Sequence, residues 1–416
     1  MKAVDVISIG AINFDYMFNC KKTESKNSDP DDGSENNGKK NRSVEEEIAM
    51  LLSTSRSSSY STQIGGSSLL ALKTIHAVDK SLSLAFVGVC GQLNEFDSWH
   101  GKNINIDSEL SFIDNQEWLF FTDNNCLGDT KYIGKSVVKL NSSNTRGNIN
   151  IAPNANELLL DYIKKHENNT NRSFVDFLSQ ARWIHISSLN NINHFCEIME
   201  YIKKAKKKNR YLQVSVDPGD EYTRRYQDQI QKYLKIADYV FLNKKEYNNL
   251  VLNESFSEND KRTKLSSYFY STDNIDTKIF IIKHKNQHQL IDFVNGRTYV
   301  YYHRTLPFYK INNDTGAGDC FAGGFIAGML SNKLLAQQPA PISLGVLCSK
   351  TRMTAINNNA VFDNIEKQAE KFFCQKYKDG ELNIKQRVRL FFQSHIDFVL
   401  GFISSLVISY ICSLLI

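Results

Sequence analysis

Several common signatures are missing from this sequence, and their absence narrows the classes of function. The eight cysteines form no CxxC pair and have no metal-ligand spacing to a histidine, and such scattered cysteines suit a reducing compartment. There is no RNP, zinc-finger or helix-turn-helix signature, and a net charge of +5 over 416 residues is too diffuse to indicate a nucleic-acid partner. The N-terminal stretch MKAVDVISIGAINF is too short and too alternating to be a signal peptide.

The C-terminus carries a long uncharged run. Residues 398–416, FVLGFISSLVISYICSLLI, would span roughly 28 Å as a helix, which is close to the thickness of a bilayer core. Basic residues at 385, 387 and 389 precede this run, so we expect a transmembrane tail anchor with the preceding domain in the cytoplasm. Two alternatives stay open: the run packs on the protein's own surface, or the chain is a fragment of a longer membrane protein.

Composition separates a folded domain from attached segments. Residues 1–365 carry the patterns of one domain, within which residues 21–44 are polar and without periodicity. We interpret residues 21–44 as a disordered surface insertion. Residues 366–397 are interpreted as a helical juxtamembrane segment, followed by the anchor at 398–416.

Apolar stretches of strand length alternate with helical patterns through the domain. This alternation predicts an α/β fold with a doubly wound, mostly parallel sheet. Residues 92–150 are instead polar with short alternating stretches, which indicate small strands and loops that form an edge sheet. The expected strands lie at 4–10, 82–91, 181–189, 211–220, 238–243 and 276–285, with a hairpin at 289–304, and the expected helices lie at 67–78, 193–208, 228–237 and 320–335.

Residues 316–319, GAGD, lead into a run of small and apolar residues. Such a turn places backbone N–H groups at a helix N-terminus, where they bind phosphate or a developing oxyanion. A bound phosphate would repel the Asp319 carboxylate, so a carboxylate at this position is unfavourable if its role is only structural. The position is explained if the carboxylate accepts the proton of an attacking hydroxyl, and Asp319 is therefore the candidate general base. The alternative is a first-turn aspartate that the helix dipole favours. The turn lacks GK[ST] and is therefore not a Walker P-loop.

The stretch NDTGAGDCFAGG (313–324) resembles the second signature of the ribokinase-like (PfkB) carbohydrate kinases, DTxGAGDxFxxG. Four further stretches resemble motifs of this family and follow in the same order: GAINFD (10–15), IGGSSLLAL (64–72), VDPGD (216–220) and LNKKE (242–246). The resemblance covers roughly residues 4–360, and the GGSS stretch is similar to the adenosine-kinase-like branch.

The resemblance implies a Rossmann-like sheet with a small β lid, and transfer of the γ-phosphate of ATP to a hydroxyl of a sugar or nucleoside. It also implies magnesium, a monovalent cation near the signature, and a homodimer formed by lid sharing. The implied catalytic residues are Asp319 as the base with Gly316, Ala317 and Gly318 as the anion hole. The implied substrate-binding residues are Asn13, Asp15, Gly65 and Gly66, and Asn243 and Glu246 would support magnesium through water.

Each of these roles has an ordinary structural alternative. Asp15 can be a turn residue at a strand end, and Gly65 with Gly66 can be a plain turn. Asn243 and Glu246 have the spacing of a helix cap and its reciprocal partner.

Three positions depart from the family pattern. Leu70 stands where an asparagine is usual, which puts sugar recognition in doubt or alters it toward a less polar ligand. The segment from Lys283 to His288 lacks the two glycines that are usual near the nucleotide. Two interpretations stay open: the charge of Lys283, Lys285 or His288 contacts phosphate instead, or the loop has moved outward. Asn313 and Asp314 also replace the usual residues, and Asp314 is expected to cap the helix or help hold a cation.

These patterns lead to one main functional hypothesis. We expect a membrane-anchored kinase that transfers phosphate from ATP to a sugar or nucleoside. The competing hypothesis is a catalytically silent binding module of the same fold held on a membrane, which the loss of the glycines at 285 and 288 and of the asparagine at 70 favours.

Overall fold

The computed structural model of this chain forms two compact units, Met1–Lys367 and Gln368–Ile416. The structure describes residues 4–19, 46, 48–49, 51, 60–101, 104–123, 126, 128–140, 154–187, 189, 191–251, 279–284, 287–293, 297–307, 310–331, 340–355 and 360–378. The predicted insertion at 21–44, the segment 379–397, the run at 398–416 and Lys285 lie outside the described residues.

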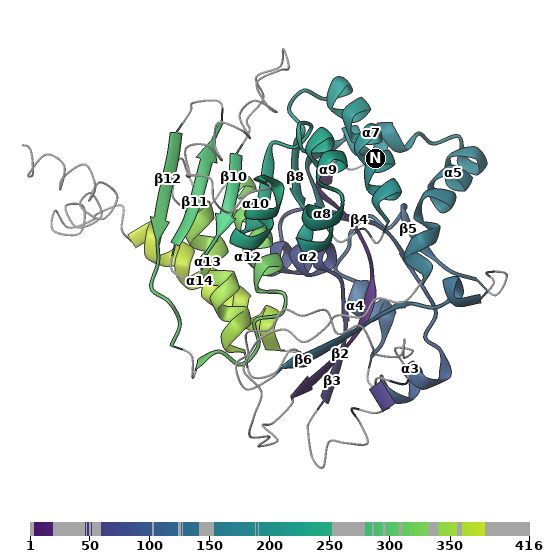
Figure 1. Ribbon diagram of the computed structural model, residues 1–416, viewed down its shortest axis with the longest axis horizontal. Helices are drawn as coiled ribbons and strands as arrows, with labels where there is room; N and C mark the ends of the chain where they lie inside the picture. Colours follow the sequence, from purple (N-terminus) through teal and green to yellow (C-terminus); the bar gives the residue numbers. More distant parts are fainter. Residues whose placement is uncertain are drawn as a thin grey trace, which may run out of the picture. The chain divides into compact units, whose positions relative to one another are not determined.

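The larger unit is built on a nine-stranded sheet in the order β12-β11-β10-β9-β8-β7-β1-β4-β5 (Figure 1). Strands from β10 to β5 pair in parallel, and β11 and β12 add an antiparallel hairpin at the other edge. The strands are β1 (Val4–Ile9), β4 (Leu84–Cys90), β5 (Leu119–Phe121), β7 (Ala181–Ser187), β8 (Gln213–Asp217), β9 (Tyr239–Asn243), β10 (Ile279–Lys283), β11 (Gln287–Asp292) and β12 (Arg297–Tyr302). The predicted mostly parallel sheet and the hairpin are therefore confirmed.

A second sheet of three strands, in the order β3-β2-β6, forms the predicted small β lid. Its strands are β2 (Asn13–Asn19), β3 (Tyr60–Gly65) and β6 (Gly134–Leu140). β2 follows β1 after a short turn, so the lid starts where the first strand of the main sheet ends. β2 pairs antiparallel with β3 and parallel with β6, which brings segments more than 100 residues apart into one sheet.

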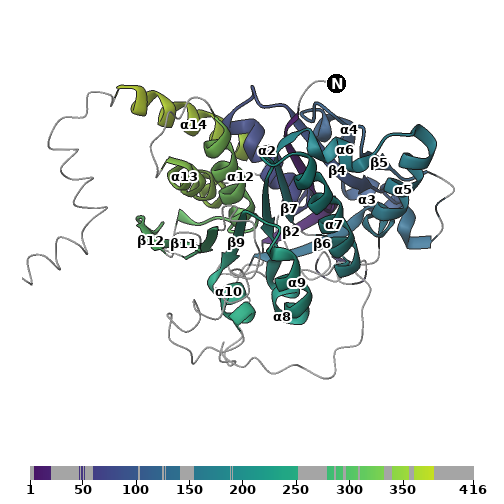
Figure 2. The ribbon, with the colours of Figure 1, turned by 90° about the horizontal axis from the view of Figure 1, so that it is seen from above.

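Helices cover both faces of the main sheet. Figure 2 shows α2, α12 and α13 on one face and α7, α8, α9 and α10 on the other. The helices of the chain are α2 (Ser67–Val78), α3 (Glu95–His100), α4 (Ile106–Leu110), α5 (Leu159–Thr170), α6 (Phe174–Ser179), α7 (Ile192–Lys208), α8 (Gly219–Arg225), α9 (Gln227–Leu234), α10 (Lys244–Val251), α12 (Ala317–Leu330), α13 (Ala340–Thr354) and α14 (Val361–Lys378), with 3-10 turns at Gly128–Lys131 and Ala155–Leu158.

The strand β9 shows how the sequence produces this layered arrangement. Successive side chains of a strand point to opposite faces, so a strand buried on both faces must be apolar throughout. Val240 and Leu242 belong to the hydrophobic core that also contains residues of α7, α9 and α10. Phe241 points the other way and packs on Phe321 and Phe325 of α12, with ring centroids 6.2 and 5.6 Å apart. The short run YVFLN therefore joins both helical layers to the sheet.

The prediction of a C-terminal transmembrane helix is wrong. Among the residues that the structure describes, no helix combines the length and the apolar character needed to cross a bilayer. α12 is apolar but has only 14 residues, and α14 has 18 residues but carries many charged side chains. The fold class is a doubly wound α/β fold with a small β lid, without this addition.

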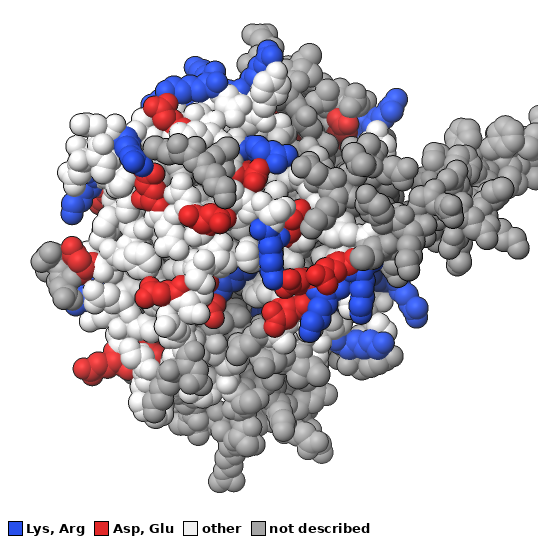
Figure 3. All heavy atoms as spheres, turned by 180° about the vertical axis from the view of Figure 1, so that it is seen from behind, with Lys and Arg blue, Asp and Glu red and all other residues white. Residues whose placement is uncertain are grey.

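Charged side chains of both signs are interspersed over one face of the molecule (Figure 3). Figure 3 shows the face behind the view of Figure 1, where acidic and basic residues lie next to one another. This distribution agrees with the small net charge of the chain.

Candidate active site

The carboxyl ends of three neighbouring parallel strands bring the first group of candidate residues together. Asp217, Asn243 and Lys283 are the last residues of β8, β9 and β10. In open α/β sheets, ligands bind beyond the carboxyl ends of the strands, at the point where the strand order changes direction. The strand order changes direction at β1, which lies between β7 and β4. The carboxyl ends of the strands in this sheet are therefore the expected place for a site.

The GAGD turn forms the N-terminus of α12. Gly316 precedes the helix and has a left-handed backbone (φ 77°, ψ 2°), which favours glycine. The Ala317 N–H donates to the Asp314 carbonyl oxygen at 3.1 Å, so this amide is engaged within the turn. The first turn of a helix leaves N–H groups without helical acceptors, and an anion is favoured there. Within the predicted anion hole, the amides of Gly316 and Gly318 therefore suit an anion better than that of Ala317.

Three side chains meet at Gly316. A β-carbon placed on this residue would lie 3.1 Å from Leu70 Cδ1, 3.5 Å from Arg352 Nε and 3.8 Å from Asp319 Oδ2. Arg352 is only 2 % exposed, and its Nε donates to the Thr315 carbonyl oxygen at 2.8 Å. The turn therefore has an apolar wall, a buried guanidinium and a carboxylate around one glycine.

Lys283 brings an ammonium group to the same turn. A β-carbon on Gly318 would lie 3.2 Å from Lys283 Nζ, which donates to Asp217 Oδ2 at 2.8 Å. Burial lowers the pKa of Lys283, but the charges of Asp217 and Glu246 outweigh it. The charge of Asp319 acts in the same direction, and the pKa is raised above its usual range. Lys283 is therefore a permanent positive charge beside the helix N-terminus.

The segment after Lys283 buries His288 against α12. His288 is 6 % exposed and packs on Phe321 with ring centroids 4.7 Å apart. Its Nδ1 accepts from the His284 N–H at 3.2 Å, and burial lowers its pKa to about 3. A neutral, buried imidazole is not a phosphate ligand. Of the three phosphate contacts predicted here, Lys283 lies beside the GAGD turn, His288 is buried against Phe321, and Lys285 lies outside the described residues.

Asn243 and Glu246 form a reciprocal helix cap at the start of α10. The Glu246 N–H donates to Asn243 Oδ1 at 2.9 Å, and the Asn243 N–H donates to Glu246 Oε2 at 2.7 Å. This is the capping arrangement that the spacing also predicted. Burial and the charge of Asp217 raise the pKa of Glu246 to about 7, although Lys283 opposes the shift. The pair therefore stabilises α10 and adds a carboxyl group close to Asp217.

Asp15 lies in the lid, in the middle of β2. Its carboxylate accepts hydrogen bonds from the Ser136 hydroxyl and, at 3.1 Å, from Gln63 Nε2. A β-carbon on Gly65 would lie 1.9 Å from Asp15 Oδ2, so the carboxylate rests directly on this glycine. Burial raises the pKa of Asp15, while the two hydrogen bonds and the charge of Arg352 lower it. These contacts fix the carboxylate and show why residue 65 has no side chain.

Asn13 lies two residues before Asp15 and therefore on the same face of β2. Its Oδ1 accepts from Asn156 Nδ2 at 3.3 Å, and the same Asn156 group donates to the Ile12 carbonyl oxygen at 3.1 Å. Gly66 follows the lid strand β3 with φ 114°, and a β-carbon there would lie 2.1 Å from the Ala11 carbonyl oxygen. The turn at Gly66 therefore packs against the backbone just before Asn13.

Arg352 connects the lid residues to the helix N-terminus. It lies beside Gly316, and its positive charge acts on Asp15. The structure thus brings together Asp15 with Asn13 on the lid side, and Asp319 with Gly316 on the helix side. Asn243 and Glu246 are joined to this group through Asp217 and Lys283.

Sequence reasoning missed two charged residues of this site. Asp217 was noticed only as part of VDPGD, and Arg352 was not noticed at all. The position of Asp217 at the carboxyl end of a predicted strand was a usable signal. Arg352 had none, because it reaches the turn from α13, a helix that follows the signature and that sequence patterns did not single out.

Comparison with known proteins agrees with the architecture. Residues 132–338 match the sequence family described as pfkB family carbohydrate kinase. No curated protein matches the chain.

Two solved structures illustrate the similarity of the fold. The ribokinase from Giardia lamblia has a TM-score of 0.61 and 16% sequence identity, over 88% of this chain and 99% of that one. The Anopheles gambiae adenosine kinase, solved in complex with P1,P4-di(adenosine-5) tetraphosphate, has a TM-score of 0.63 and 16% identity, over 87% and 98%. At this level of identity, the similarity establishes the fold and not the substrate.

Proposed function

We propose that this chain, whose residues 132–338 belong to the pfkB carbohydrate kinase family, transfers the γ-phosphoryl group of ATP to a hydroxyl of a sugar or nucleoside. The observation that carries this proposal is the position of Asp319. It lies in the first turn of α12, with its carboxylate facing Gly316, at a helix N-terminus that suits an anion.

Asp319 acts as the general base in the proposed reaction. Its carboxylate takes the proton of the acceptor hydroxyl while the hydroxyl oxygen forms a bond to the γ-phosphorus. The bond between the γ-phosphorus and the oxygen that bridges to the β-phosphate breaks, and ADP leaves with that electron pair. Proton transfer of this kind contributes roughly 10²- to 10⁴-fold to the rate.

Fixed positive charges and backbone amides stabilise the transferring phosphoryl group. The amides of Gly316 and Gly318 lie at the helix N-terminus, Lys283 lies beside Gly318, and Arg352 lies beside Gly316. Preorganised groups of this kind act strongly because they need no rearrangement as charge develops in the transition state. Lys283 and Arg352 thus flank the GAGD turn on different sides and replace with charge the close backbone approach that glycines at 285 and 288 would give.

Asp15 and Asn13 orient the acceptor. A carboxylate held by Ser136 and Gln63 still has lone pairs for substrate hydroxyls. Leu70 is buried against Gly316 and offers no hydrogen bond next to the reacting hydroxyl. An acceptor with an apolar edge at this point fits the site better than one with a further hydroxyl there.

Magnesium fits this site only through water. Asn243 Oδ1 and Glu246 Oε2 are engaged in the helix cap, and the described residues contain no group of three His, Cys, Asp or Glu side chains that would enclose a metal ion. Glu246 is the residue that would hold the water shell of a magnesium ion brought by ATP. When bound, the ion would offset the charge of the phosphate oxygens.

The test is ADP release by the full chain with Mg-ATP across a panel of sugars and nucleosides. We expect turnover with one class of acceptor, and loss of that turnover in Asp319→Ala. No turnover with any acceptor, together with no rise in melting temperature on adding ATP, would support the catalytically silent binding module instead.

A further inference from the structure

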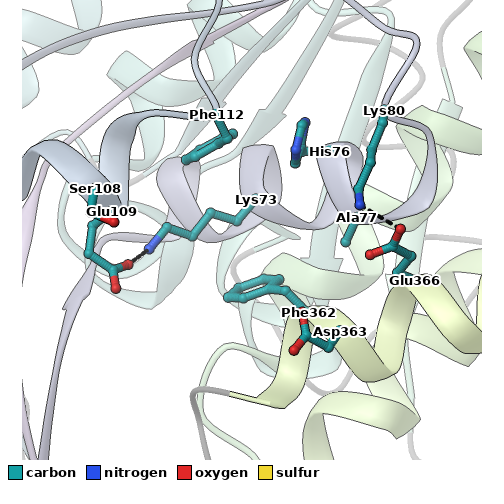
Figure 4. A pocket seen from close by; sticks show the side chains of 10 residues that line it. All are labelled: Lys73, His76, Ala77, Lys80, Ser108, Glu109, Phe112, Phe362, Asp363 and Glu366. Carbon is teal, nitrogen blue, oxygen red and sulfur yellow. Dashed lines mark hydrogen bonds and ion pairs between the residues drawn. The ribbon is translucent and has the colours of Figure 1, made fainter.

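A small pocket lies beside α2, and residues of α4 and α14 also line it. Three residues of α2 and Lys80 just after it form its floor, and residues of α4, of the loop after α4 and of the first turns of α14 form its walls (Figure 4). Its volume is about 280 Å³. The lining residues are Lys73, His76, Ala77, Lys80, Ser108, Glu109, Phe112, Phe362, Asp363 and Glu366.

This pocket shares no lining residue with the acceptor and phosphate region, although the charge of its Lys73 acts on Asp15. The opposite side of α2 packs on α12, where a β-carbon on Gly323 would lie 2.4 Å from the Ala71 carbonyl oxygen and 2.7 Å from Thr74 Cβ. Leu70 lies on that side, against Gly316. None of the residues proposed above for catalysis or acceptor binding lines the pocket.

Aromatic rings form two of its walls. Phe112 and Phe362 lie on either side of the Lys73 side chain in Figure 4, and His76 lies beside Phe112 with ring centroids 5.5 Å apart. The Lys73 ammonium group already lies over the Phe362 ring, 5.9 Å from its centroid. Rings arranged in this way offer flat apolar surfaces and attract positive charge to their faces.

The polar groups of the pocket carry an excess of negative charge. Lys73 pairs with Glu109 at 2.5 Å, and Lys80 pairs with Glu366 at 2.6 Å. Asp363 adds a third negative charge to these two ion pairs. Burial and the charge of Lys80 lower the pKa of His76 and favour its neutral form. Three carboxylates thus face two ammonium groups, which disfavours an anionic ligand and leaves acceptors for hydrogen-bond donors.

From the rings, the charges and the size of the pocket, we propose an accessory binding site for an uncharged or cationic planar heterocycle no larger than a nucleoside. The rings of Phe112 and Phe362 contact the faces of the heterocycle, and the carboxylates of Glu109 and Asp363 accept hydrogen bonds from its N–H or O–H groups. The volume of about 280 Å³ is slightly below the range of roughly 300–1,000 Å³ that is common for small-molecule sites, which limits the ligand to a small one.

Adenine is a suitable probe because it is planar, uncharged and has no hydroxyl to phosphorylate. Its binding to the full chain would be measured by calorimetry in the parent protein and in Phe112→Ala, Phe362→Ala and Asp15→Asn. Tyr211→Ala is the matched control, since this aromatic residue is 72 % exposed and distant in sequence from every pocket residue. Photolabelling of the parent protein with 8-azidoadenine, followed by peptide mapping, locates the site without any variant.

We expect each phenylalanine substitution to weaken adenine binding by about ten-fold, since a stacked ring contributes that much or more. Asp15→Asn, which removes a charge that interacts with Lys73, changes the affinity less than either phenylalanine substitution, and Tyr211→Ala leaves it unchanged. The label is found in peptides 73–80, 106–112 or 361–367. Adenosine monophosphate, an anion, binds this site more weakly than adenine. The proposal is overturned if adenine does not bind, if the label falls on the acceptor region, if Asp15→Asn alone weakens binding, or if the monophosphate binds the pocket more tightly than adenine.

Discussion

The ammonium group of Lys283 lies 2.8 Å from Oδ2 of Asp217 and also beside Gly318 in the first turn of α12. Both side chains are largely buried, with 16 % and 10 % of their surfaces exposed. A buried ion pair is thus placed where the carboxyl ends of β8 and β10 meet a helix N-terminus. Because the negative charge of Asp217 favours the protonated form of Lys283, the ammonium group keeps its charge and can bind a phosphate oxygen.

Replacing Lys283 with methionine should lower both stability and activity. Removing one partner of a buried pair leaves an uncompensated charge on Asp217, which costs about 3 kcal/mol or more of the free energy of unfolding. The double variant Lys283→Met, Asp217→Asn removes both charges and should recover much of that loss. Urea unfolding of the three proteins measures the first effect, and ADP release measures the second.

The double variant separates a catalytic role of Lys283 from a structural one. If Lys283 acts on the phosphoryl group, the double variant regains stability but not turnover. Recovery of turnover together with stability would show that the pair serves only to hold the strands and the helix in place.

Removing the Arg352 charge should move the pH dependence of the reaction. Burial raises the pKa of Asp15, and the Arg352 charge lowers it, so Arg352→Met raises the pKa of Asp15 further. Asp15 must be ionised to accept two hydroxyl bonds, and therefore the acidic limb of the pH profile of kcat/KM should shift to higher pH. Arg172→Met, at a half-exposed arginine paired with Glu117, is the control. An acidic limb that stays in place in Arg352→Met would contradict this assignment.

Gly65→Ala should impair acceptor binding. The added methyl group would lie 1.9 Å from Asp15 Oδ2, so the carboxylate must move. A displacement of this size costs about 100-fold in kcat/KM when the group positions a substrate. The loss should appear with the acceptor varied, while the KM for ATP changes little. Gly219→Ala is the control for a loss of stability alone, because nothing lies within 4 Å of its added methyl group while its φ of 74° strains any side chain there. Equal losses in both variants would rule out the acceptor role.

Glu246 should make the protein less stable as the pH rises through neutrality. Its pKa is raised to about 7 in the folded chain, above the ordinary value of 4.5. The folded state therefore binds more protons than the unfolded state between these values, and the stabilisation present below pH 4.5 is lost as pH rises toward 7 and above. Glu246→Gln keeps an acceptor for the Asn243 N–H and removes the titration, so its stability should change less between pH 5 and pH 8. Urea midpoints at both pH values test this. An unchanged difference between the two pH values would contradict it.

The fold could be predicted from sequence because its elements are strongly patterned. The helix at 67–78 was predicted with the bounds that the structure shows, and strands such as 238–243 were placed within one residue. These runs carry their own signals: a continuous apolar strand, a glycine before a helix, and alternation of the two. The expected helix at 320–335 begins earlier, at Ala317, because the GAGD turn itself supplies its first residues.

The region 92–150 and the position of Arg352 in the site could not be predicted from sequence patterns. Small strands and loops were expected there, but α3 and α4 are short helices whose caps, Asn94 and Asn105, lie within polar sequence. β6 joins the lid only through pairing with β2, a contact between distant segments that has no local signal. Arg352 is likewise placed by the packing of α13 on α12, and only the tertiary structure brings it to Gly316.

The measurement that tests the central claim most directly compares Asp319→Asn with Asp176→Asn. Both residues are first-turn aspartates of a helix, in α12 and α6, so both share the interaction with the helix dipole. With the acceptor found in the panel, Asp319→Asn should lower kcat by about 100-fold or more, whereas Asp176→Asn should leave kcat unchanged. A kcat in Asp319→Asn close to that of the parent protein would contradict the role of Asp319 as the base.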